Sequence, residues 1–363
     1  VFAGSFDIAA ATAVAGTRLG GEEIVFKRLA SLIDKSLVTR EPRGAGARFR
    51  LLETTRAFAS ERRTNAGERE GFALMARFML ARAEAITATF ETTPTVKFAD
   101  EIAPDLDNIR AAIEWAHGPE GDRALAVALT SAVVQIMLEL GLVAETRRLL
   151  NRAVACIDDT TPPAVAANLL HCSGFRFTTL LGSEAATLAR ASALARQSGQ
   201  PWLMARVLLV EIQALRVVAP ERVEEQTREA LAQVELLGPS KVQGLGLSSR
   251  ALTHALAGRH QAAQADMGRA IDMLRLVDYR WGLPYACCIA VECAVLAHDI
   301  PRAIAAGRDA MAAAERPGIG AMAAFAATCL AAALLVGGET VEGLAWARGA
   351  HANAMAVGEE ALM

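Results

Sequence analysis

The stretch SSRALTHALAGRHQAAQADMGRAI, residues 248–271, contains the pattern that decides the fold. An apolar run is followed by Gly258 and then by a more charged run with small apolar residues at i, i+3 and i+4 spacing, which is typical of two amphipathic helices. Glycine suits the position between them because a helix commonly ends at a residue with positive φ. The stretch therefore predicts a helical hairpin.

Five further segments between residues 131 and 351 follow the same plan, with a Gly, Pro or Asp turn in the same place. Successive turns are 41, 38, 38, 41 and 39 residues apart. A single hairpin of this kind cannot bury its apolar face, so neighbouring hairpins must stack. We predict a right-handed α-solenoid of about six helix pairs over residues 121–363. The turns are at Gly141, Gly182, Pro220, Gly258, Asp299 and Gly338.

The front of the chain differs from this repeat. SLVTREPRGAGARFRLLE, residues 36–53, predicts a small β-hairpin between two helical runs, which is the outline of a winged-helix module over residues 1–65. Residues 66–120 are predicted to be a helical linker. Its segment 103–116, APDLDNIRAAIEWA, begins like a helix at Pro104, and we expect it to pack the linker onto the first repeat. Its polar residues Asp107 and Asn108 are either a site or a solvated edge.

The composition is 53% hydrophobic and 5% aromatic, so the predicted fold is mainly α, packed by small aliphatic side chains. A net charge of -3 gives no general attraction to nucleic acid or anionic lipid. We find no membrane-spanning run in the sequence and expect no signal peptide. Its six cysteines lack zinc-ligand spacing and are expected to be reduced, as in a cytoplasmic protein. Because the chain opens with Val1 inside an apolar phrase, we expect the winged-helix module to be truncated at its N-terminus.

Four phrases occur in a fixed order: VFAGSFDIAAA at 1–11, RLASLIDKSLV at 28–38, RFRLLETTRAFASERR at 48–63 and DLDNIRAAIEWA at 105–116. This order resembles bacterial STAND-class (NB-ARC-like) ATPases and transcriptional regulators, and the repeats resemble tetratricopeptide repeats (TPRs). The resemblance implies an ATPase domain upstream of Val1 and a helical sensor behind the winged helix. It also implies that the winged helix packs against the ATPase domain and does not read DNA.

No catalytic or nucleotide-binding motif is found in the sequence. The four lysines lack the glycine-rich loop that precedes the lysine of a phosphate-binding P-loop, and the six histidines are scattered. We therefore expect no enzyme, no metal site and no cofactor in these residues. By the resemblance, ATP belongs to the upstream domain.

The wing is the best candidate for contact with nucleic acid. The helical run before it has Lys27, Arg28 and Lys35, offset by three acidic residues, which is a weak surface for base reading. The hairpin itself is richer in arginine, enough for phosphate contacts. Nucleic acid is nevertheless an unexpected partner for this part of the chain. The candidate phosphate contacts are Arg40, Arg43, Arg48 and Arg50.

The first helix of each predicted pair should line the concave face of the solenoid, where polar residues are exceptions among apolar ones. Arg216, Arg250 and His254 fall at related places, and such a group could hold an anionic ligand or an acidic peptide. Alternatively, they form salt bridges with neighbouring helices, for instance with Glu211 or Glu292. The full set of candidate groove residues is Gln135, Arg176, Glu211, Gln213, Arg216, Arg250, His254 and Glu292.

Together these features predict the sensory and protein-interaction half of an ATP-dependent signalling or transcriptional regulator. An inducer or partner would bind in the concave groove, and the other expected partner is the chain's own upstream ATPase domain; no membrane is involved. The alternatives are a passive TPR scaffold that binds peptide segments and a DNA-binding winged-helix regulator.

Overall fold

The computed structural model divides the chain into two compact units. Unit 1 comprises Val1–Ala88, Phe98–Val133 and Ala155–Asp158, and unit 2 comprises Thr89–Lys97, Val134–Val154 and Asp159–Met363. These units do not coincide with the three segments predicted from the sequence, because most of the expected linker belongs to unit 1. The structure describes residues 1–43, 46–62, 65–174, 185–218, 222–235, 238–315 and 320–357.

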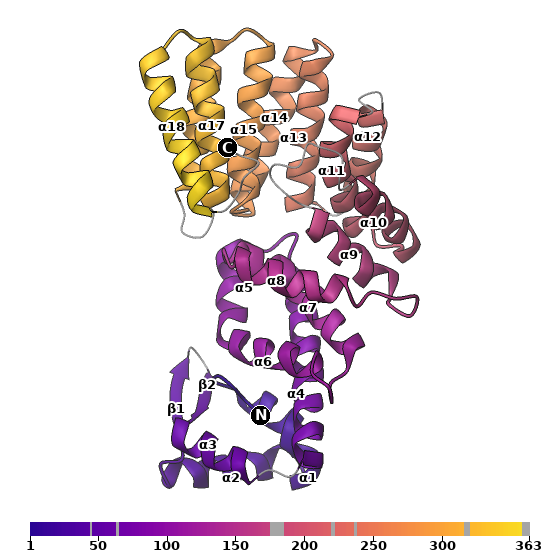
Figure 1. The fold of residues 1–363 in the computed structure, drawn as a ribbon, viewed down its shortest axis with the longest axis vertical. Helices are drawn as coiled ribbons and strands as arrows, with labels where there is room; N and C mark the ends of the chain where they lie inside the picture. Colours follow the sequence, from indigo (N-terminus) through magenta and orange to yellow (C-terminus); the bar gives the residue numbers. More distant parts are fainter. Residues whose placement is uncertain are drawn as a thin grey trace. The chain divides into compact units, whose positions relative to one another are not determined.

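Unit 1 begins with the winged-helix elements. The Asp7 carboxylate accepts a hydrogen bond from the Ala10 amide at 2.8 Å and so caps the first helix, which ends at Gly20 with φ of 95°. The two wing strands pair antiparallel, from Val38 opposite Leu51 to Arg43 opposite Gly46, and appear as adjacent arrows (Figure 1). The elements are α1 (Ile8–Leu19), α2 (Glu22–Asp34), β1 (Val38–Arg43), β2 (Gly46–Leu51) and α3 (Glu53–Glu61).

The remaining elements of unit 1 come from the segment expected to be a linker. Helix α6 packs against α4, and α4 also packs against α1, so residues 103–116 join the winged-helix unit. The prediction that they pack onto the first repeat stays a prediction. The elements are α4 (Asn65–Thr87), α5 (Thr95–Ile102), whose first three residues belong to unit 2, the 3-10 helix η1 (Ala103–Asp105) and α6 (Leu106–Ala116).

The predicted helical pairs follow in chain order. The expected turn glycines Gly141, Gly258 and Gly338 have φ of 77°, 73° and 83°, as helix ends require, and Asp299 caps a helix through the amide of Arg302. Gly182 and Pro220 lie outside the described residues. The pairs are α7 (Arg123–Glu139) and α8 (Val143–Val154), α9 (Pro163–Gly174) and α10 (Ala185–Ser198), α11 (Pro201–Val218) and α12 (Val223–Val234), α13 (Lys241–Leu256) and α14 (His260–Leu276), α15 (Gly282–Leu296) and α16 (Ile300–Ala314), and α17 (Gly320–Val336) and α18 (Thr340–Val357).

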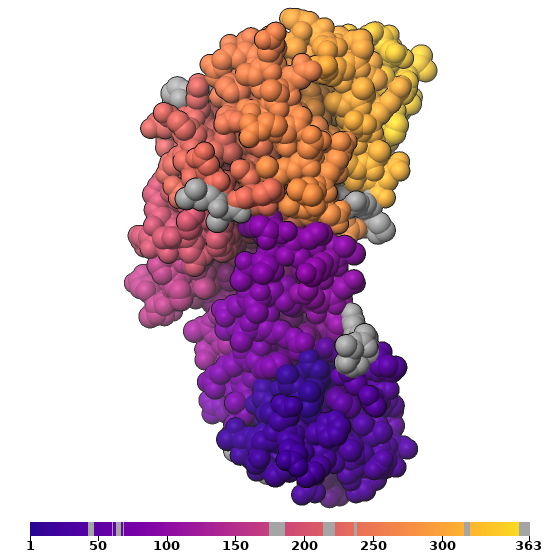
Figure 2. All heavy atoms as spheres, turned by 180° about the vertical axis from the view of Figure 1, so that it is seen from behind, coloured from indigo at the N-terminus to yellow at the C-terminus, as the bar shows by residue number. Residues whose placement is uncertain are grey.

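In unit 2 these pairs stack in the order of the chain. The first helices are neighbours in series, α9 with α11, α11 with α13, α13 with α15 and α15 with α17. The corresponding surface bands follow one another from pink to yellow (Figure 2). The predicted mainly α fold, a solenoid of helical hairpins behind a small winged-helix module, is confirmed. Helix α7 starts in unit 1 and ends in unit 2, so the repeat begins where the two units meet in the sequence.

Small side chains allow the helices of unit 2 to approach closely. One buried cluster joins Ala251, Ala255 and Ala263 of α13 and α14 to Ile289 of α15. A Cβ atom on Gly246 would lie 2.6 Å from Leu231 Cδ2, so a larger residue at this position of α13 would require the Leu231 side chain of α12 to move. The six cysteines are free thiols. None of the described helices has the length and apolar character needed to cross a membrane.

Candidate ligand-binding pocket

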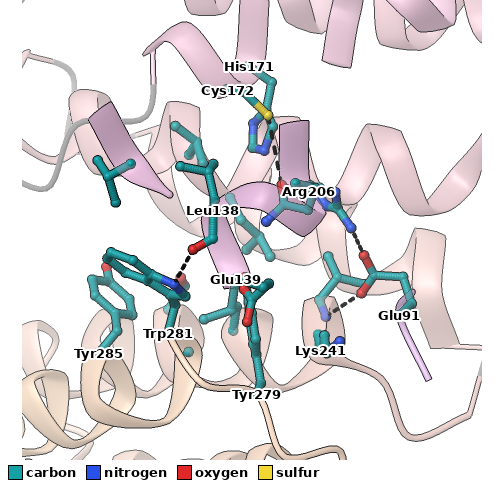
Figure 3. A pocket seen from close by; sticks show the side chains of 18 of the residues that line it. Glu91, Leu138, Glu139, His171, Cys172, Arg206, Lys241, Tyr279, Trp281 and Tyr285 are labelled. Carbon is teal, nitrogen blue, oxygen red and sulfur yellow. Dashed lines mark hydrogen bonds and ion pairs between the residues drawn. The ribbon is translucent and has the colours of Figure 1, made fainter. Parts of the chain in front are cut away.

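Unit 2 contains a pocket of about 120 Å³ to which the first helix of all six pairs contributes (Figure 3). This is the arrangement expected of the inner wall of a helical solenoid. Apolar walls come from residues such as Leu209, Val242 and Leu245, while charged and aromatic side chains converge from α7, α9, α11, α13 and the turn before α15. The polar and aromatic lining consists of Glu91, Gln135, Glu139, Arg147, His171, Cys172, Arg206, Lys241, Ser249, Tyr279, Trp281 and Tyr285.

Glu91 occupies one end of this pocket, between Arg206 and the beginning of α13 (Figure 3). One carboxylate oxygen pairs with the Arg206 guanidinium, and the other accepts the amide of Val242 at 2.9 Å. The first amides of a helix have no partner within the helix and favour negative charge, so the start of α13 is a suitable place for a carboxylate. Burial lowers the pKa of the Arg206 guanidinium, but the negative charge of the neighbouring Glu91 outweighs this effect, so the pKa of Arg206 is raised above its ordinary value. This end of the pocket is therefore a carboxylate-binding site.

Lys241 contacts the backbone of Phe90 and Glu91 and the aromatic ring of Phe90. Its Nζ donates to the carbonyl of Phe90 at 2.8 Å and lies 3.9 Å from the centre of the Phe90 ring, a cation–π distance. Its own amide donates to the carbonyl of Glu91 at 2.9 Å. Burial lowers the pKa of Lys241 to about 8, although Glu139 and Glu91 oppose that shift. The side chain is 1% exposed, so its position is fixed by these contacts.

Glu139 contributes a second buried carboxyl, from the last turn of α7. Its Oε2 accepts from Thr95 Oγ1 at 3.2 Å, whereas its Oε1 has no hydrogen-bond partner among the described residues. Burial raises the pKa of Glu139 to about 7, even though Lys241, Thr95 and two arginines favour the charged form. Near neutral pH this group can therefore either donate or accept a hydrogen bond.

His171 and Cys172 of α9 form another part of the wall. Burial lowers the pKa of His171 to about 3, so its imidazole is neutral, and its Nδ1 has no hydrogen-bond partner among the described residues. The Cys172 thiol and the Arg206 guanidinium both donate to Gln135 Oε1, at 3.8 and 3.3 Å. Burial raises the pKa of Cys172 to about 12, which keeps it a thiol and a poor nucleophile.

Aromatic side chains near the start of α15 supply the apolar wall of the pocket. Trp281 donates its indole N–H to the carbonyl of Leu138 at 2.9 Å, which fixes the ring against the end of α7 (Figure 3). A Cβ on Gly282 would lie 2.2 Å from the Tyr279 ring, so glycine is needed for this ring to enter the pocket. The stretch 278–288, which concentrates these aromatics in the sequence, thus shapes the pocket as well as packing against neighbours.

The structure separates the candidate groove residues predicted from the sequence. Gln135 lines the pocket. Glu211 is buried elsewhere, where it accepts from Ser192 Oγ at 2.5 Å. Arg250 and His254 line a different, more open groove of about 780 Å³ between α12, α13 and α14. There Arg250 makes two hydrogen bonds of 2.6 and 2.7 Å to Asp266, so the salt-bridge alternative describes it correctly, although with a different partner.

The other candidates in the groove are less defined. Glu292 lies half-buried in α15 and is not part of the pocket lining. Arg176 and the side chains of Gln213 and Arg216 lie outside what the structure describes. Arg250 and His254 therefore lie outside the pocket. A role for Arg216 in binding an anion stays a prediction.

The wing arginines also differ from one another. Arg48 is 7% exposed and donates to Asp105 at 2.6 Å and to the carbonyl of Ser5 at 2.6 Å. The prediction that Arg48 contacts phosphate is corrected, because its guanidinium is held inside unit 1. Arg40 is exposed, Arg50 is exposed and lies 3.4 Å from Glu41, and the side chain of Arg43 is outside the described set.

Asp105 and Asn108 explain the phrase DLDN in structural terms. Asn108 accepts the amides of Ala3 and Gly4 at 3.0 and 2.9 Å and donates to the Ser5 carbonyl at 2.7 Å. Both side chains are fully buried, whereas Asp107 is exposed and pairs with Arg110. Of the two alternatives left open by the sequence, Asp107 is the solvated edge and Asn108 anchors the chain's first residues.

Sequence reasoning missed most of the charged residues of the pocket, among them Glu91, Glu139, His171, Arg206 and Lys241. A signal existed for Glu139, because it lies four residues after Gln135 on an otherwise apolar helix and so shares its face. Arg206 is likewise a polar exception in PWLMARVLLV. Within the described part of the chain, no group of His, Cys, Asp and Glu side chains is arranged to hold a metal ion.

Comparisons with known proteins agree with the front of the chain most directly. Residues 1–64 match the family model "Winged helix-turn-helix domain", which confirms the predicted winged-helix module. Proteins of Mycobacterium bovis and Mycobacterium tuberculosis, named as candidate HTH-type transcriptional regulators, are 32% identical over 114 residues, or 31% of this chain. The match covers 13% of the length of each of those relatives.

Among solved structures, the chain matches a Signal Transduction ATPase with Numerous Domains (STAND) protein with a tetratricopeptide repeat sensor, from Pyrococcus horikoshii. The match has a TM-score of 0.41 and 13% sequence identity, and it covers 96% of this chain and 60% of that one.

Proposed function

We propose that the chain is the sensory part of a transcription regulator and that the pocket of unit 2 binds a small-molecule effector. The winged helix-turn-helix match and the mycobacterial relatives named as transcription regulators support a regulatory protein. Because the chain spans only a small part of those relatives, the ATPase domain and the output of the whole protein remain part of the proposal.

The observation that carries the proposal is the pair of buried polar atoms in the pocket, Glu139 Oε1 and His171 Nδ1. Leaving a buried polar group without a hydrogen bond costs about 1–3 kcal/mol, so a molecule that satisfies both atoms recovers that energy on binding. The cavity of about 120 Å³ exceeds the space of a single water molecule. Apolar walls with a few convergent polar groups are the usual composition of small-molecule sites.

Two groups of the pocket, Cys172 and His171, are unsuited to catalysis. A thiol with a pKa of about 12 and an imidazole with a pKa of about 3 act neither as nucleophile nor as base near pH 7. We therefore propose binding without chemistry, with ATP as the cofactor of the upstream domain alone. A regulatory effect further requires that the effector bind two states of the protein with different affinity.

For the winged helix, we propose docking to the chain's own ATPase domain as its role. Ile24 and Phe26 of α2 are 40% and 56% exposed, and Lys27 of the same helix lies 2.5 Å from Glu23. Apolar, charge-neutralised surface is suited to protein contact, whereas base reading uses exposed Arg, Lys, Asn or Gln. A passive peptide-binding scaffold and a DNA-binding regulator are the competing functions.

The test is a metabolite screen by thermal shift, followed by calorimetric titration of each ligand that raises Tm. A ligand of the pocket should bind Glu139→Gln at least tenfold more weakly and Trp281→Ala more weakly still. Asp272→Asn, at a side chain 81% exposed, is the matched control and should bind normally. Ligands whose affinity is the same in all four proteins, or binding confined to a protein partner, would contradict the proposal.

A further inference from the structure

The carboxylate site of the pocket is occupied by two residues of the same chain, Phe90 and Glu91. Both carbonyls and the carboxylate of this dipeptide are engaged: the Phe90 carbonyl by Lys241 Nζ, the Glu91 carbonyl by the Lys241 amide, and the carboxylate by Arg206 and the Val242 amide. The centre of the Phe90 ring lies within cation–π distance of two cations, 3.9 Å from Lys241 Nζ and 5.0 Å from the Arg206 guanidinium. The dipeptide is bound as a ligand would be.

Its origin in the sequence sets it apart from the wall that binds it. Phe90 and Glu91 belong to the connection between α4 and α5, not to a helical pair, and the residues that bind them follow 115 to 151 positions later. The chain reaches them from Ala88 of unit 1 and returns to unit 1 at Phe98. The nine-residue segment Thr89–Lys97 thus belongs to unit 2 and brings Phe90 and Glu91 to the carboxylate site.

We propose that Phe90 and Glu91 are an internal ligand that closes the carboxylate site, and that the effector competes with them through a carboxylate of its own. This rests on the proposed function, since it names the chemical class of the effector: a small carboxylate with an apolar or aromatic body. The adjoining Glu139 Oε1, buried and without a hydrogen-bond partner among the described residues, gives the incoming molecule a further group to bind.

Competition of this kind would also transmit binding along the chain. When an effector carboxylate replaces Glu91, residues 89–97 lose their contacts with Arg206, Lys241 and Val242. The segment follows α4 of unit 1 at its N-terminal end. At its C-terminal end it forms the first turn of α5, whose later residues belong to unit 1. Occupancy of the pocket therefore changes the restraint on unit 1 through covalent connections alone.

The probe is the capped dipeptide acetyl-Phe-Glu-amide, which carries the groups that the wall recognises, and acetyl-Phe-Gln-amide is its neutral control. In the variant Phe90→Ala/Glu91→Ala the site is vacant, and calorimetry should show binding of the first dipeptide at least tenfold tighter than of the second. The wild-type chain should bind acetyl-Phe-Glu-amide at least tenfold more weakly than the variant, since its tethered pair competes at a high effective concentration.

Adding Arg206→Met to the vacant variant should abolish the preference for the charged dipeptide. Adding Arg259→Met, at an exposed arginine that pairs with Glu224, should leave it unchanged. Equal binding of both dipeptides, or equal binding by wild type and vacant variant, would overturn the proposal. Neither result depends on finding the effector. A metabolite screen without a ligand would contradict the proposed function, whereas these dipeptide experiments test the internal-ligand proposal separately.

If the double variant does not fold, hydrogen exchange of the single variant Glu91→Gln decides the matter. The Val242 amide loses a charged acceptor and should exchange at least tenfold faster than in wild type. The Gln243 amide, capped by Ser240 Oγ at 3.3 Å, serves as the internal reference and should not change. An unchanged Val242 amide would mean that the carboxylate is not held there, and the proposal would fail.

Discussion

Both units of the molecule bury charged side chains, but they arrange them differently. In unit 1 the Asp105 carboxylate lies between Arg48, at 2.6 Å, and Arg82, at 3.1 Å, and Arg82 also pairs with Asp7 at 2.7 Å. Burial would raise the pKa of Asp7, but hydrogen bonds from Arg82 and the Ala10 amide hold it below its ordinary value. Each of these two carboxylates has a basic partner within ion-pair distance.

In unit 2 the Glu139 carboxyl has one oxygen without a hydrogen-bond partner among the described residues, faces a cavity, and has a pKa raised to about 7 by burial. The contrast separates two uses of buried charge. A matched acid fixes one packing arrangement, because removing either partner leaves the other stranded. An acid that is held near its titration point beside an open volume can respond to what enters that volume.

The largest effect should come from breaking the matched network. Asp105→Asn leaves Arg48 buried without its counter-charge, and we expect it to lower the free energy of unfolding of unit 1 by about 3–5 kcal/mol in a urea titration. Asp107→Asn, two residues away at a carboxylate that is 58% exposed, is the matched control and should change stability by less than about 0.5 kcal/mol. Similar losses for the two variants would mean that the buried network does not stabilise the fold.

The unmatched acid of unit 2 should appear in the pH dependence of stability. Between pH 4.5 and about 7 the unfolded chain has released the Glu139 proton while the folded protein keeps it, so stability falls as pH rises through this window. Glu139→Gln has no proton to lose at this position, so its free energy of unfolding should not show this fall. The difference in unfolding free energy between the variant and wild type should therefore grow by about 1–3 kcal/mol from pH 5 to pH 8. Urea titrations at both values measure it, with the exposed Glu224→Gln as the control for charge. If the difference in unfolding free energy between Glu139→Gln and wild type is the same at both pH values, Glu139 is not the group that makes stability depend on pH.

A smaller effect is expected at the more open groove. Arg250→Ala leaves Asp266, whose side chain is 9% exposed, with two more distant partners among the described residues, His254 at 3.6 Å and Arg269 at 3.9 Å. We expect a loss of about 1–2 kcal/mol in stability, against almost none for Arg269→Ala, and unchanged affinity for any ligand of the pocket. Loss of ligand binding in Arg250→Ala would restore the interpretation that this arginine binds an anion.

The smallest effect concerns the wing. Changing Arg40 and Arg50 together to Ala should alter stability by less than about 0.5 kcal/mol, because both side chains are exposed. We expect no retardation of duplex DNA in gel-shift assays by either protein at physiological salt. Salt-dependent retardation that disappears in the variant would favour the DNA-binding alternative.

The repeat was predictable because it depends on local pattern. The spacing of turns near forty residues, the glycines with positive φ and the apolar first helices all follow from residues close together in the sequence. Gln135 was found by the same logic, as a polar exception on an apolar helix, and its neighbour Glu139 could have been found in this way.

The closure of the pocket was not predictable on those grounds. Phe90 and Glu91 precede their partners by 115 to 151 residues, and nothing local in TATFETTP indicates that the segment enters the solenoid. Arg48 was misinterpreted for the same reason: an arginine in a hairpin is usually solvated, and only the tertiary structure brings the buried carboxylate of Asp105 to it. Periodicity predicted the walls of unit 2, while the contacts within the walls depend on long-range packing.

The interleaving of the two units along the chain has a practical consequence for anyone who wishes to produce them separately. A truncation after residue 120, where the sequence suggests a boundary, would remove residues 121–133 from the N-terminal product and Thr89–Lys97 from the C-terminal one. The second product would lack Phe90 and Glu91 and would display an unfilled cationic cleft to the solvent. Half-length expression products of this protein should therefore be designed with a grafted 89–97 peptide or avoided in favour of the intact chain.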